Sequence, residues 1–180
     1  MKIDLVARAI RFAAEAHAGQ YRKGSHVPYI THPMEAALIM LQMGGSPEYV
    51  AAALLHDTVE DTSVTPEQIR AEFGEEVARL VSGETCDKAC TWEECKQAIL
   101  DSIKAAPREE QLLTLSDKLA NIRSMAYDYA QQGDELWSRF KRGYDKQKWY
   151  YISLKDAFSA LDDVEEYLEF TALVDSVFEK

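Results

Sequence analysis

Apolar residues along this chain recur at helical spacing almost from end to end. In the first segment Leu5, Ala9, Phe12 and Ala16 are three or four residues apart, so they lie along one stripe of a helix. The sequence contains no convincing alternation of β-branched and polar residues, and no Asn-Gly or Asp-Gly pair that would mark a hairpin. The pattern therefore predicts an all-α, multi-helix protein.

Proline, glycine and hydroxyl residues divide this pattern into successive helices. Ser46-Pro47 and Thr65-Pro66 are typical of helix starts, with the hydroxyl residue as N-cap and proline in the first turn. Gly133 indicates the end of the longest helix. We expect helices over residues 5–16, about 33–44, from 46 through the AAALLH segment (51–56), 65–73, 77–81, 91–105 and 110–129, then one ending near 161 and a last one over about 162–179. An aspartate at 162 or 163 is expected to cap the last helix.

The most apolar stretch, residues 50–55, is followed directly by the six residues HDTVED. On a continuous helix His56 and Glu60 are i,i+4 neighbours, as are Asp57 and Asp61, so all four crowd onto one side. Carboxylates at the C-terminal end of a helix oppose its dipole. A solvated helix terminus is the alternative interpretation, but the placement favours a bound cation or a catalytic proton.

Two side chains elsewhere suit the same chemistry. His32 lies at the start of the second helix, and Asp117 lies in an apolar part of the long helix, where an unpaired carboxylate is rare. Asn121 and Ser124 follow at helical spacing and share the face of Asp117. His32 and Asp117, together with the histidine and first aspartate of HDTVED, form a set of two histidines and two aspartates. Such a set suits Mn²⁺, Fe²⁺ or Zn²⁺ better than Ca²⁺ or Mg²⁺.

Composition narrows the class of protein further. The 180 residues carry a formal net charge of −11, which argues against nucleic acid as a partner because that role needs a basic face. No apolar run reaches the roughly 20 residues that span a bilayer, and the first ten residues lack the features of a signal peptide. We therefore expect a cytoplasmic protein without a membrane partner, and the oligomeric state is left open.

The three cysteines, Cys86, Cys90 and Cys95, all fall within one short stretch. An odd number in so short a segment does not read as a disulfide framework, and the absence of a nearby histidine disfavours a zinc site. Reduced thiols are the favoured interpretation.

Five motifs together resemble a known family. They are AHAGQ through RKG (16–24), PYITHP (28–33), AALLHDTVEDT (52–62), Phe-Gly with the following helix (73–85), and SDKLANIRS (116–124). In this order they resemble the HD-domain metal-dependent phosphohydrolases. Within these, the sequence is most similar to the RelA/SpoT-type branch and its stand-alone small alarmone hydrolases.

The resemblance implies an HD-type helical bundle with a central metal site. His32, His56, Asp57 and Asp117 would bind the metal, most typically Mn²⁺, with Fe²⁺ or Zn²⁺ as alternatives. The implied reaction is removal of the 3′-pyrophosphate from (p)ppGpp to give GDP or GTP and pyrophosphate, so the partner is a small phosphorylated nucleotide.

Roles for other residues follow from the same resemblance. Glu60 and Asp61 would lie beside the metal and its water as catalytic groups, and the sequence does not divide the labour between them. Arg22 would stack on the purine, and Lys23 would contact phosphate or ribose. These side chains suit such roles, because guanidinium is planar and ammonium is compact.

The remaining implied contacts are Asn121 and Ser124, which would line the nucleotide pocket, and Tyr144, which would contact the phosphates. For Tyr144 an ordinary core tyrosine is the alternative. A departure from the family lies at Cys95, in WEECK, where relatives often carry a basic residue (WEERK).

Two other functions stay open from sequence. A related HD enzyme would act on (p)ppApp, on another 3′-phosphorylated nucleotide, or on NADPH. A degenerate HD domain would bind nucleotide without catalysis, although all six metal and acid residues are present. We expect residues 1–180 to form a single hydrolase domain, with a core over about 5–161, an acidic C-terminal helix over about 162–179 and no synthetase domain.

Overall fold

The structure is a computed structural model that describes residues 3–83 and 90–179. Within these ranges every regular element is a helix, and the one pairing of extended backbone is an isolated bridge between Tyr21 and Pro28. The α-helices are α1 (Ile3–Ala16), α2 (Thr31–Gln42), α3 (Pro47–Leu55), α4 (Thr58–Asp61), α5 (Pro66–Phe73), α6 (Glu75–Gly83), α7 (Trp92–Ala105), α8 (Arg108–Gln132), α9 (Gly143–Ala157) and α10 (Glu165–Phe178). Two 3₁₀ helices, η1 (Gly133–Arg139) and η2 (Ser159–Leu161), flank α9. The all-α prediction is confirmed.

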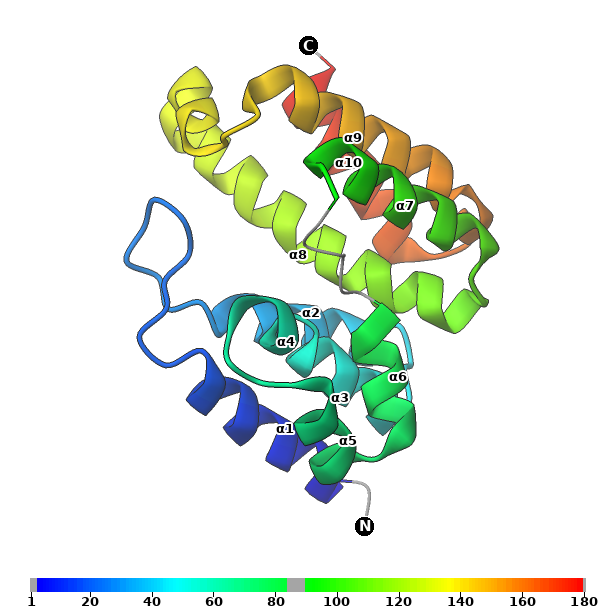
Figure 1. Ribbon diagram of the computed structural model, residues 1–180. Coiled ribbons are helices and arrows are strands. Elements are labelled where there is room, and N and C mark those ends of the chain that lie inside the picture. Colours follow the sequence, from blue (N-terminus) through cyan, green and yellow to red (C-terminus); the bar gives the residue numbers. More distant parts are fainter. Residues whose placement is uncertain (1–2, 84–89, 180) are drawn as a thin grey trace.

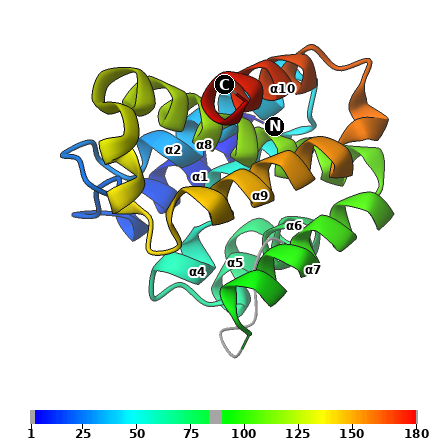
Figure 2. The same cartoon turned by 90° about the horizontal axis from the view of Figure 1, so that it is seen from above.

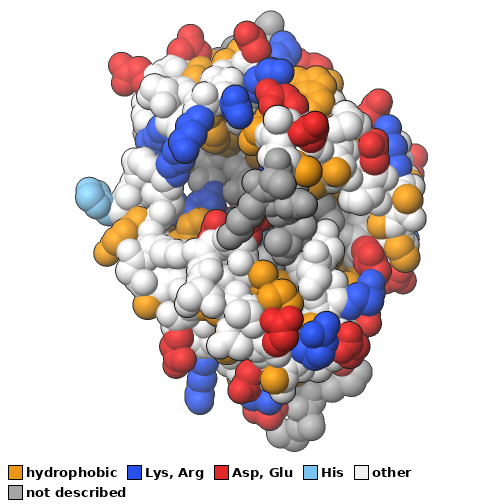
Figure 3. Space-filling model, in the orientation of Figure 1, with side chains coloured by type: hydrophobic (Ala, Val, Ile, Leu, Met, Phe, Trp, Pro, Cys, Tyr) orange, Lys and Arg blue, Asp and Glu red, His pale blue; other side chains and the backbone are white. Residues whose placement is uncertain are grey.

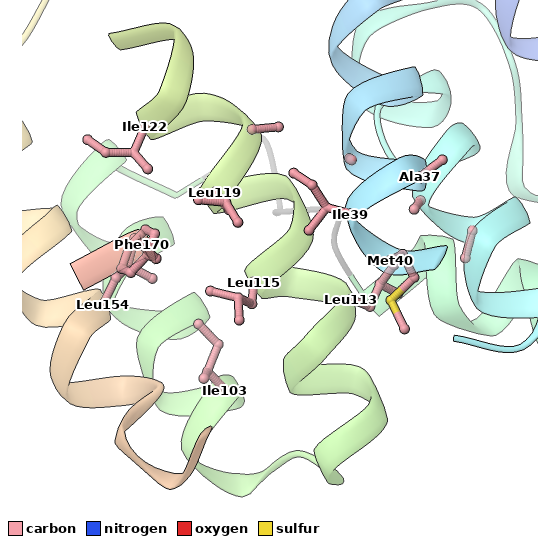
Figure 4. Packing of buried hydrophobic residues seen from close by; sticks show 14 of the residues in the cluster. Ala37, Ile39, Met40, Ile103, Leu113, Leu115, Leu119, Ile122, Leu154 and Phe170 are labelled. Carbon is pink, nitrogen blue, oxygen red and sulfur yellow. The ribbon is translucent and has the colours of Figure 1, made fainter. Parts of the chain in front are cut away.

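Helix α8 is the longest element and runs between two groups of helices. Figure 1 shows α1 to α6 on one side of it and α7, α9 and α10 on the other, and Figure 2 shows the molecule from the side of α9 and α10. In Figure 4, Ile39 of α2 approaches α8 from one side, while Leu154 and Phe170 approach from the other. Leu115 and Leu119 of α8 are fully buried between them. Residues on α8 are therefore held by both halves of the core.

Two of the helix starts follow their sequence signals closely. The side chain of Thr65 accepts a hydrogen bond from the backbone of Gln68, whose side chain accepts one in return from Thr65, forming a capping box. Thr91 forms the same motif with Glu94 at the start of α7. Each box satisfies two backbone donors that the helix itself leaves unpaired.

Two other caps differ from prediction. Ser46 is the N-cap of α3, but its hydroxyl donates to the carboxylate of Glu48 instead of accepting from the backbone. The N-cap of α10 is Val164 and not Asp162 or Asp163. Asp163 instead receives two hydrogen bonds from Arg108, each 2.8 Å long. In both places a polar side chain is engaged by another side chain.

The chain does not continue as one helix through HDTVED, so that prediction is wrong. Helix α3 ends at Leu55, His56 and Asp57 form a turn, and the short α4 starts at Thr58. The fully buried Thr58 stabilises this turn, since its hydroxyl donates to the carbonyl of Leu55 at 2.7 Å. The last two acids, Glu60 and Asp61, thus belong to a new helical turn rather than to the end of α3.

The cysteine prediction is also corrected. Cys95 is disulfide-bonded, so the expectation of reduced thiols is wrong for this residue. Cys90 is free and exposed, and Cys86 lies outside the described residues. No helix in the described ranges combines the length and hydropathy needed to cross a membrane.

Candidate metal centre and adjoining cavities

Two histidines and two aspartates from three parts of the fold converge beside α8. Nε2 of His32, from α2, lies 3.0 Å from Oδ1 of Asp117, from α8, and 3.5 Å from Oδ2 of Asp57. Nε2 of His56 lies 3.0 Å from the same Asp57 oxygen and 3.5 Å from the Asp117 oxygen. Both histidines and Asp117 are buried. The ligand atoms of His32, His56 and Asp57 lie close enough together to bind one metal ion.

The orientation of His56 fits a metal ligand. Its Nδ1 lies 2.8 Å from the carbonyl oxygen of Ala53, and because a carbonyl only accepts, Nδ1 donates this hydrogen bond. In the neutral ring, Nε2 then presents a lone pair to the carboxylates of Asp57 and Asp117. This nitrogen is buried and has no hydrogen-bond partner. A lone pair facing two acceptors is stable only with a cation or a proton among them, as in metal sites whose histidines are fixed by a backbone carbonyl.

Burial opposes protonation of His56, but Asp57 and Asp117 raise its pKa well above the usual range, so without a metal ion a proton on His56 takes the place of the cation. Burial by itself would raise the pKa of Asp57, but His56 and His32 hold it well below its usual range. Burial likewise opposes ionisation of Asp117, yet Lys118 and the two histidines keep its pKa low. Both carboxylates therefore stay ionised, which is the state that binds a cation.

A chain of hydrogen bonds joins Asp117 to the loop between α1 and α2. The amide nitrogen of Asn121 donates to Oδ1 of Asp117 at 2.7 Å. The amide oxygen of Asn121 accepts a hydrogen bond from the guanidinium of Arg22 at 2.9 Å. Arg22 also lies over the ring of Tyr29, 5.7 Å from its centroid. Arg22 and Asn121, both predicted from the sequence, are thus connected to the His/Asp cluster through the carboxylate of Asp117.

Tyr29 connects Asp57, one of the four residues of the His/Asp cluster, to Asp61. Its hydroxyl lies 2.6 Å from an Asp57 oxygen and 3.1 Å from an Asp61 oxygen. Burial and the Asp57 carboxylate raise the pKa of Tyr29, so the phenol keeps its proton and donates. Gln20 donates to the backbone carbonyl of Asp61 at 2.8 Å and lies against His17. These contacts hold Asp61 beside the cluster although it is exposed.

Glu60 has a raised pKa. Partial burial and the neighbouring carboxylates of Asp61 and Asp57 all raise it. A raised pKa brings a carboxylate closer to the range where it can accept and return a proton. Glu60 and Asp61 both line the cavity next to the cluster.

A cavity of about 540 Å³ opens on one side of the cluster. Its lining includes the predicted residues Arg22, Lys23, Asn121 and Ser124. Figure 3 shows a hollow on this face of the molecule, with lysine and arginine side chains gathered along one rim. This volume lies within the typical range for small-molecule sites, roughly 300 to 1,000 Å³.

A smaller cavity of about 190 Å³ adjoins the larger one and has the cluster in its wall. Its lining includes all four cluster residues, Glu60 and Asp61, and two lysines, Lys96 and Lys118. Tyr29, His32 and Asn121 line both cavities. The two cavities therefore meet at the His/Asp cluster. The larger cavity has an apolar and basic wall, and the wall of the smaller one is strongly charged.

The structure brings Tyr144 to neither cavity. Its hydroxyl donates to the backbone carbonyl of Phe178 at 3.2 Å, and its ring packs edge-on against Trp137 with centroids 4.9 Å apart. Tyr144 thus lies in an aromatic cluster that joins α9 to α10, as the core alternative described. The tyrosines that line the larger cavity are instead Tyr29, Tyr127 and the buried Tyr151.

Sequence reasoning assigned no role to Tyr29, Lys96 or Arg139, which all line the cavities. Tyr29 stands in PYITHP, three residues before His32, and its place in a family motif was the available signal. Lys96 follows Cys95 at the very place where the sequence departs from the family pattern. Arg139 carried no signal, because its position depends on how η1 folds back against the loop at Gly24.

Comparison with known proteins shows which protein family the chain belongs to. The family described as HD domain matches residues 9–143, about three quarters of the chain. The chain belongs to the HD domain family. This HD domain is 40% identical over 124 residues to the guanosine-3′,5′-bis(diphosphate) 3′-pyrophosphohydrolase MESH1 of Xenopus tropicalis, a match that covers 67% of this chain and 69% of that protein. A similar match to the guanosine-3′,5′-bis(diphosphate) 3′-pyrophosphohydrolase of Aquifex aeolicus, 40% over 123 residues, covers 18% of that longer protein.

Solved structures agree with the fold of this HD domain. The crystal structure of lmo0812 from Listeria monocytogenes aligns with a TM-score of 0.77 at 40% identity, covering 83% of this chain and 99% of that one. A metazoan ortholog of SpoT, described as hydrolyzing ppGpp, aligns with a TM-score of 0.79 over 94% of this chain. At 23% identity, the second likeness supports the fold alone.

Proposed function

We propose that this HD domain is a metal-dependent hydrolase that removes the 3′-pyrophosphate from ppGpp or pppGpp, leaving GDP or GTP. The observation that carries the proposal is the meeting of two cavities at the buried His/Asp cluster, with Tyr29, His32 and Asn121 in both walls. A nucleotide with phosphates on its 3′ side fits this arrangement when its nucleoside occupies the larger cavity. The names of the relatives from frog and Aquifex support the same activity.

His32, His56, Asp57 and Asp117 are the proposed metal ligands, and Mn²⁺ is the proposed ion. Mixed imidazole and carboxylate ligands suit Mn²⁺, Fe²⁺ or Zn²⁺. A divalent cation bound there would lower the pKa of a water molecule and polarise a phosphoryl oxygen. Lys118 and Asn121 hold the Asp117 carboxylate in place, as outer partners of metal ligands do.

The protein's own acids move the protons in the proposed reaction. Glu60 or Asp61 accepts a proton from the attacking water, whose oxygen bonds to the phosphorus next to the ribose. The bond from that phosphorus to the 3′ oxygen breaks, and the 3′ oxygen takes up a proton to become a hydroxyl group. Pyrophosphate and the nucleoside 5′-diphosphate or 5′-triphosphate are the two products.

The larger cavity would hold the nucleoside. Arg22 has a planar guanidinium suited to stacking on a purine, and Lys23 and Ser124 line the same cavity. Because Arg22 donates to Asn121, and Asn121 donates to Asp117, a base that binds Arg22 would reach the metal cluster through two hydrogen bonds. Nucleotide binding and the arrangement of the metal site are therefore coupled.

The direct test is pyrophosphate release from ppGpp by purified protein in the presence of Mn²⁺. We expect turnover that stops when EDTA removes the metal and returns when Mn²⁺ is restored. If calorimetry shows Mn²⁺ bound at one ion per chain and no pyrophosphate is released, the proposal is wrong. A parallel panel of ppApp and NADPH, assayed under the same conditions, measures the preference for guanine over other 3′- or 2′-phosphorylated nucleotides.

A further inference from the structure

Lys96 is a half-buried lysine without an acidic partner in the smaller cavity. It lies on α7, across the cavity from the acids of the α3–α4 turn. Its ammonium group lies over the ring of Tyr150, 5.0 Å from the centroid. Among the described residues no carboxylate lies within ion-pair distance of it. Charged groups removed from water are normally paired, so this arrangement is unfavourable unless an anion binds there.

The surroundings of Lys96 increase this imbalance. Burial and the positive charge of Lys118 lower its pKa to about 8. Asp117, Glu60 and Asp57 oppose this lowering from across the cavity, but these are the proposed metal ligands and catalytic acids. Lys118 already forms an ion pair with Asp117, so Lys96 is the lysine of this cavity that can bind a further anionic group.

The position of this site matches one part of the proposed substrate. The larger cavity would hold the nucleoside, and the phosphate next to the ribose would lie at the His/Asp cluster. The distal phosphate of a 3′-pyrophosphate then extends away from the nucleoside, beyond the cluster, into the smaller cavity. Lys96 lines this cavity and is absent from the lining of the larger one.

We propose that Lys96 binds the distal phosphate of the 3′-pyrophosphate, so that the smaller cavity selects substrates with two phosphates at the 3′ position over those with one. This inference rests on the proposed function, because it assumes the same orientation of the nucleotide. A compact ammonium group with three donors suits a phosphate at this place.

The test compares two substrates that differ only in the distal phosphate. We expect Lys96→Met to lower kcat/KM for ppGpp on the order of 10- to 100-fold, the loss of one charge-assisted contact. The same variant should change kcat/KM for guanosine 5′-diphosphate 3′-monophosphate less than about twofold, because that substrate never reaches Lys96. Lys96→Arg should retain part of the preference. An equal loss for both substrates, or no loss, would overturn the proposal.

Lys104→Met is the matched control, since Lys104 lies on the same helix but is exposed and lines neither cavity. It should leave both substrates unchanged. Thermal melting of each variant shows whether the fold is intact.

A binding measurement separates this inference from the proposed function. Pyrophosphate and inorganic phosphate are titrated into the Mn²⁺-loaded protein at one fixed concentration of free Mn²⁺. Lys96→Met should weaken pyrophosphate binding at least tenfold and leave phosphate binding within about twofold. If the wild-type protein hydrolyses no alarmone, this titration still decides the role of Lys96. Pyrophosphate binding that is unchanged by the substitution overturns it.

Discussion

Single atoms decide much of the chemistry at this site. The hydroxyl of Tyr29 contacts one oxygen from the proposed metal ligand Asp57 and one from the proposed acid–base residue Asp61. The carboxylates of Asp57 and Asp61 repel each other, and a hydroxyl that contacts both reduces the repulsion. Tyr29 is therefore a positioning residue for both groups, although it takes no part in the proposed bond changes.

Removing only this hydroxyl tests that role. We expect Tyr29→Phe to lower kcat about 10- to 100-fold, since Asp61 loses the contact that orients it. Mn²⁺ affinity should fall less, because both histidines and Asp117 keep their positions. Turnover and Mn²⁺ calorimetry measure the two effects separately. Tyr21→Phe is the control in the same loop, as Tyr21 is 58% exposed, and equal effects from both variants would contradict the assignment.

The pH dependence of activity follows from the raised pKa of Glu60. A carboxylate accepts a proton only when ionised, so activity is lost as the pH falls through that pKa. Burial and the charges of Asp61 and Asp57 raise this pKa above the ordinary value for glutamate, and a bound Mn²⁺ would lower it again. This pKa sets the acidic limb of the kcat/KM profile. Asp61→Asn removes one of these charges and should move the limb of the residual activity to lower pH. A limb that does not move would mean that Glu60 is not the base.

At the scale of elements, the loop between α1 and α2 carries the proposed nucleotide-binding residues Arg22 and Lys23 and lies against η1. Gly24 has a φ of +72°, in the left-handed region, and a β-carbon there would lie 2.7 Å from Nε of Arg139. Arg139 is itself held by Asp128 at 2.8 Å. Close contact between the loop and η1 therefore requires glycine at this position.

Gly24→Ala should raise KM for ppGpp several-fold with a smaller change in kcat. The added methyl group collides with Arg139 and moves the loop that carries Arg22 and Lys23, whereas the metal cluster is unaffected. Gly19→Ala is a matched control, because Gly19 has a φ of +78° but no atom within 4 Å of the added carbon. Both variants incur the same backbone strain, so an equal rise in KM would show that the contact with Arg139 has no role.

At the scale of the whole molecule, the charge of −11 is distributed unevenly. Residues 156–180 contain eight acidic residues and one basic residue, a formal charge of −7. Several of these acids are paired with basic residues of α8 and α9: Asp163 with Arg108, Glu169 with Arg123, and Asp175 with Lys155. The acidic C-terminal segment thus packs on the basic side chains of its neighbours. Such exposed pairs add little stability individually, so the apolar contacts of α10 with α8 hold the segment in place.

The proposed metal ion would also join separate parts of the fold, since its ligands come from α2, the α3–α4 turn and α8. An ion that binds only the folded state at 100 times its dissociation constant stabilises it by about 2.7 kcal/mol. For a chain of this size we expect saturating Mn²⁺ to raise Tm by roughly 5 to 10 °C.

His56→Ala should abolish most of this rise, judged against the Tm of the same variant without metal. Asp156→Ala, at an exposed acid remote from the cluster in sequence, should keep it. Differential scanning calorimetry with and without EDTA measures both. A full Mn²⁺-dependent rise in His56→Ala would place the ion elsewhere.

The sequence by itself determined the helices and the kinds of residue at the site. Apolar spacing and capping boxes act through neighbours within a few positions, so they predicted the all-α fold and the starts of α5 and α7. The same local view assumed a continuous helix through HDTVED and missed the turn at His56. It did so because the turn depends on Thr58 being buried among other helices.

Only the tertiary structure decided which distant residues meet. His32 and Asp117 are 85 positions apart, yet their side chains lie 3.0 Å from each other because α2 packs on α8. Packing of α7 on α8 and α9 brings Lys96 to the smaller cavity, and packing of α9 on α10 places Tyr144 in the aromatic cluster beside Phe178. Spacing along a chain fixes the face of a helix on which a side chain lies. Which other helix packs against that face is determined by how whole helices bury their apolar surfaces together.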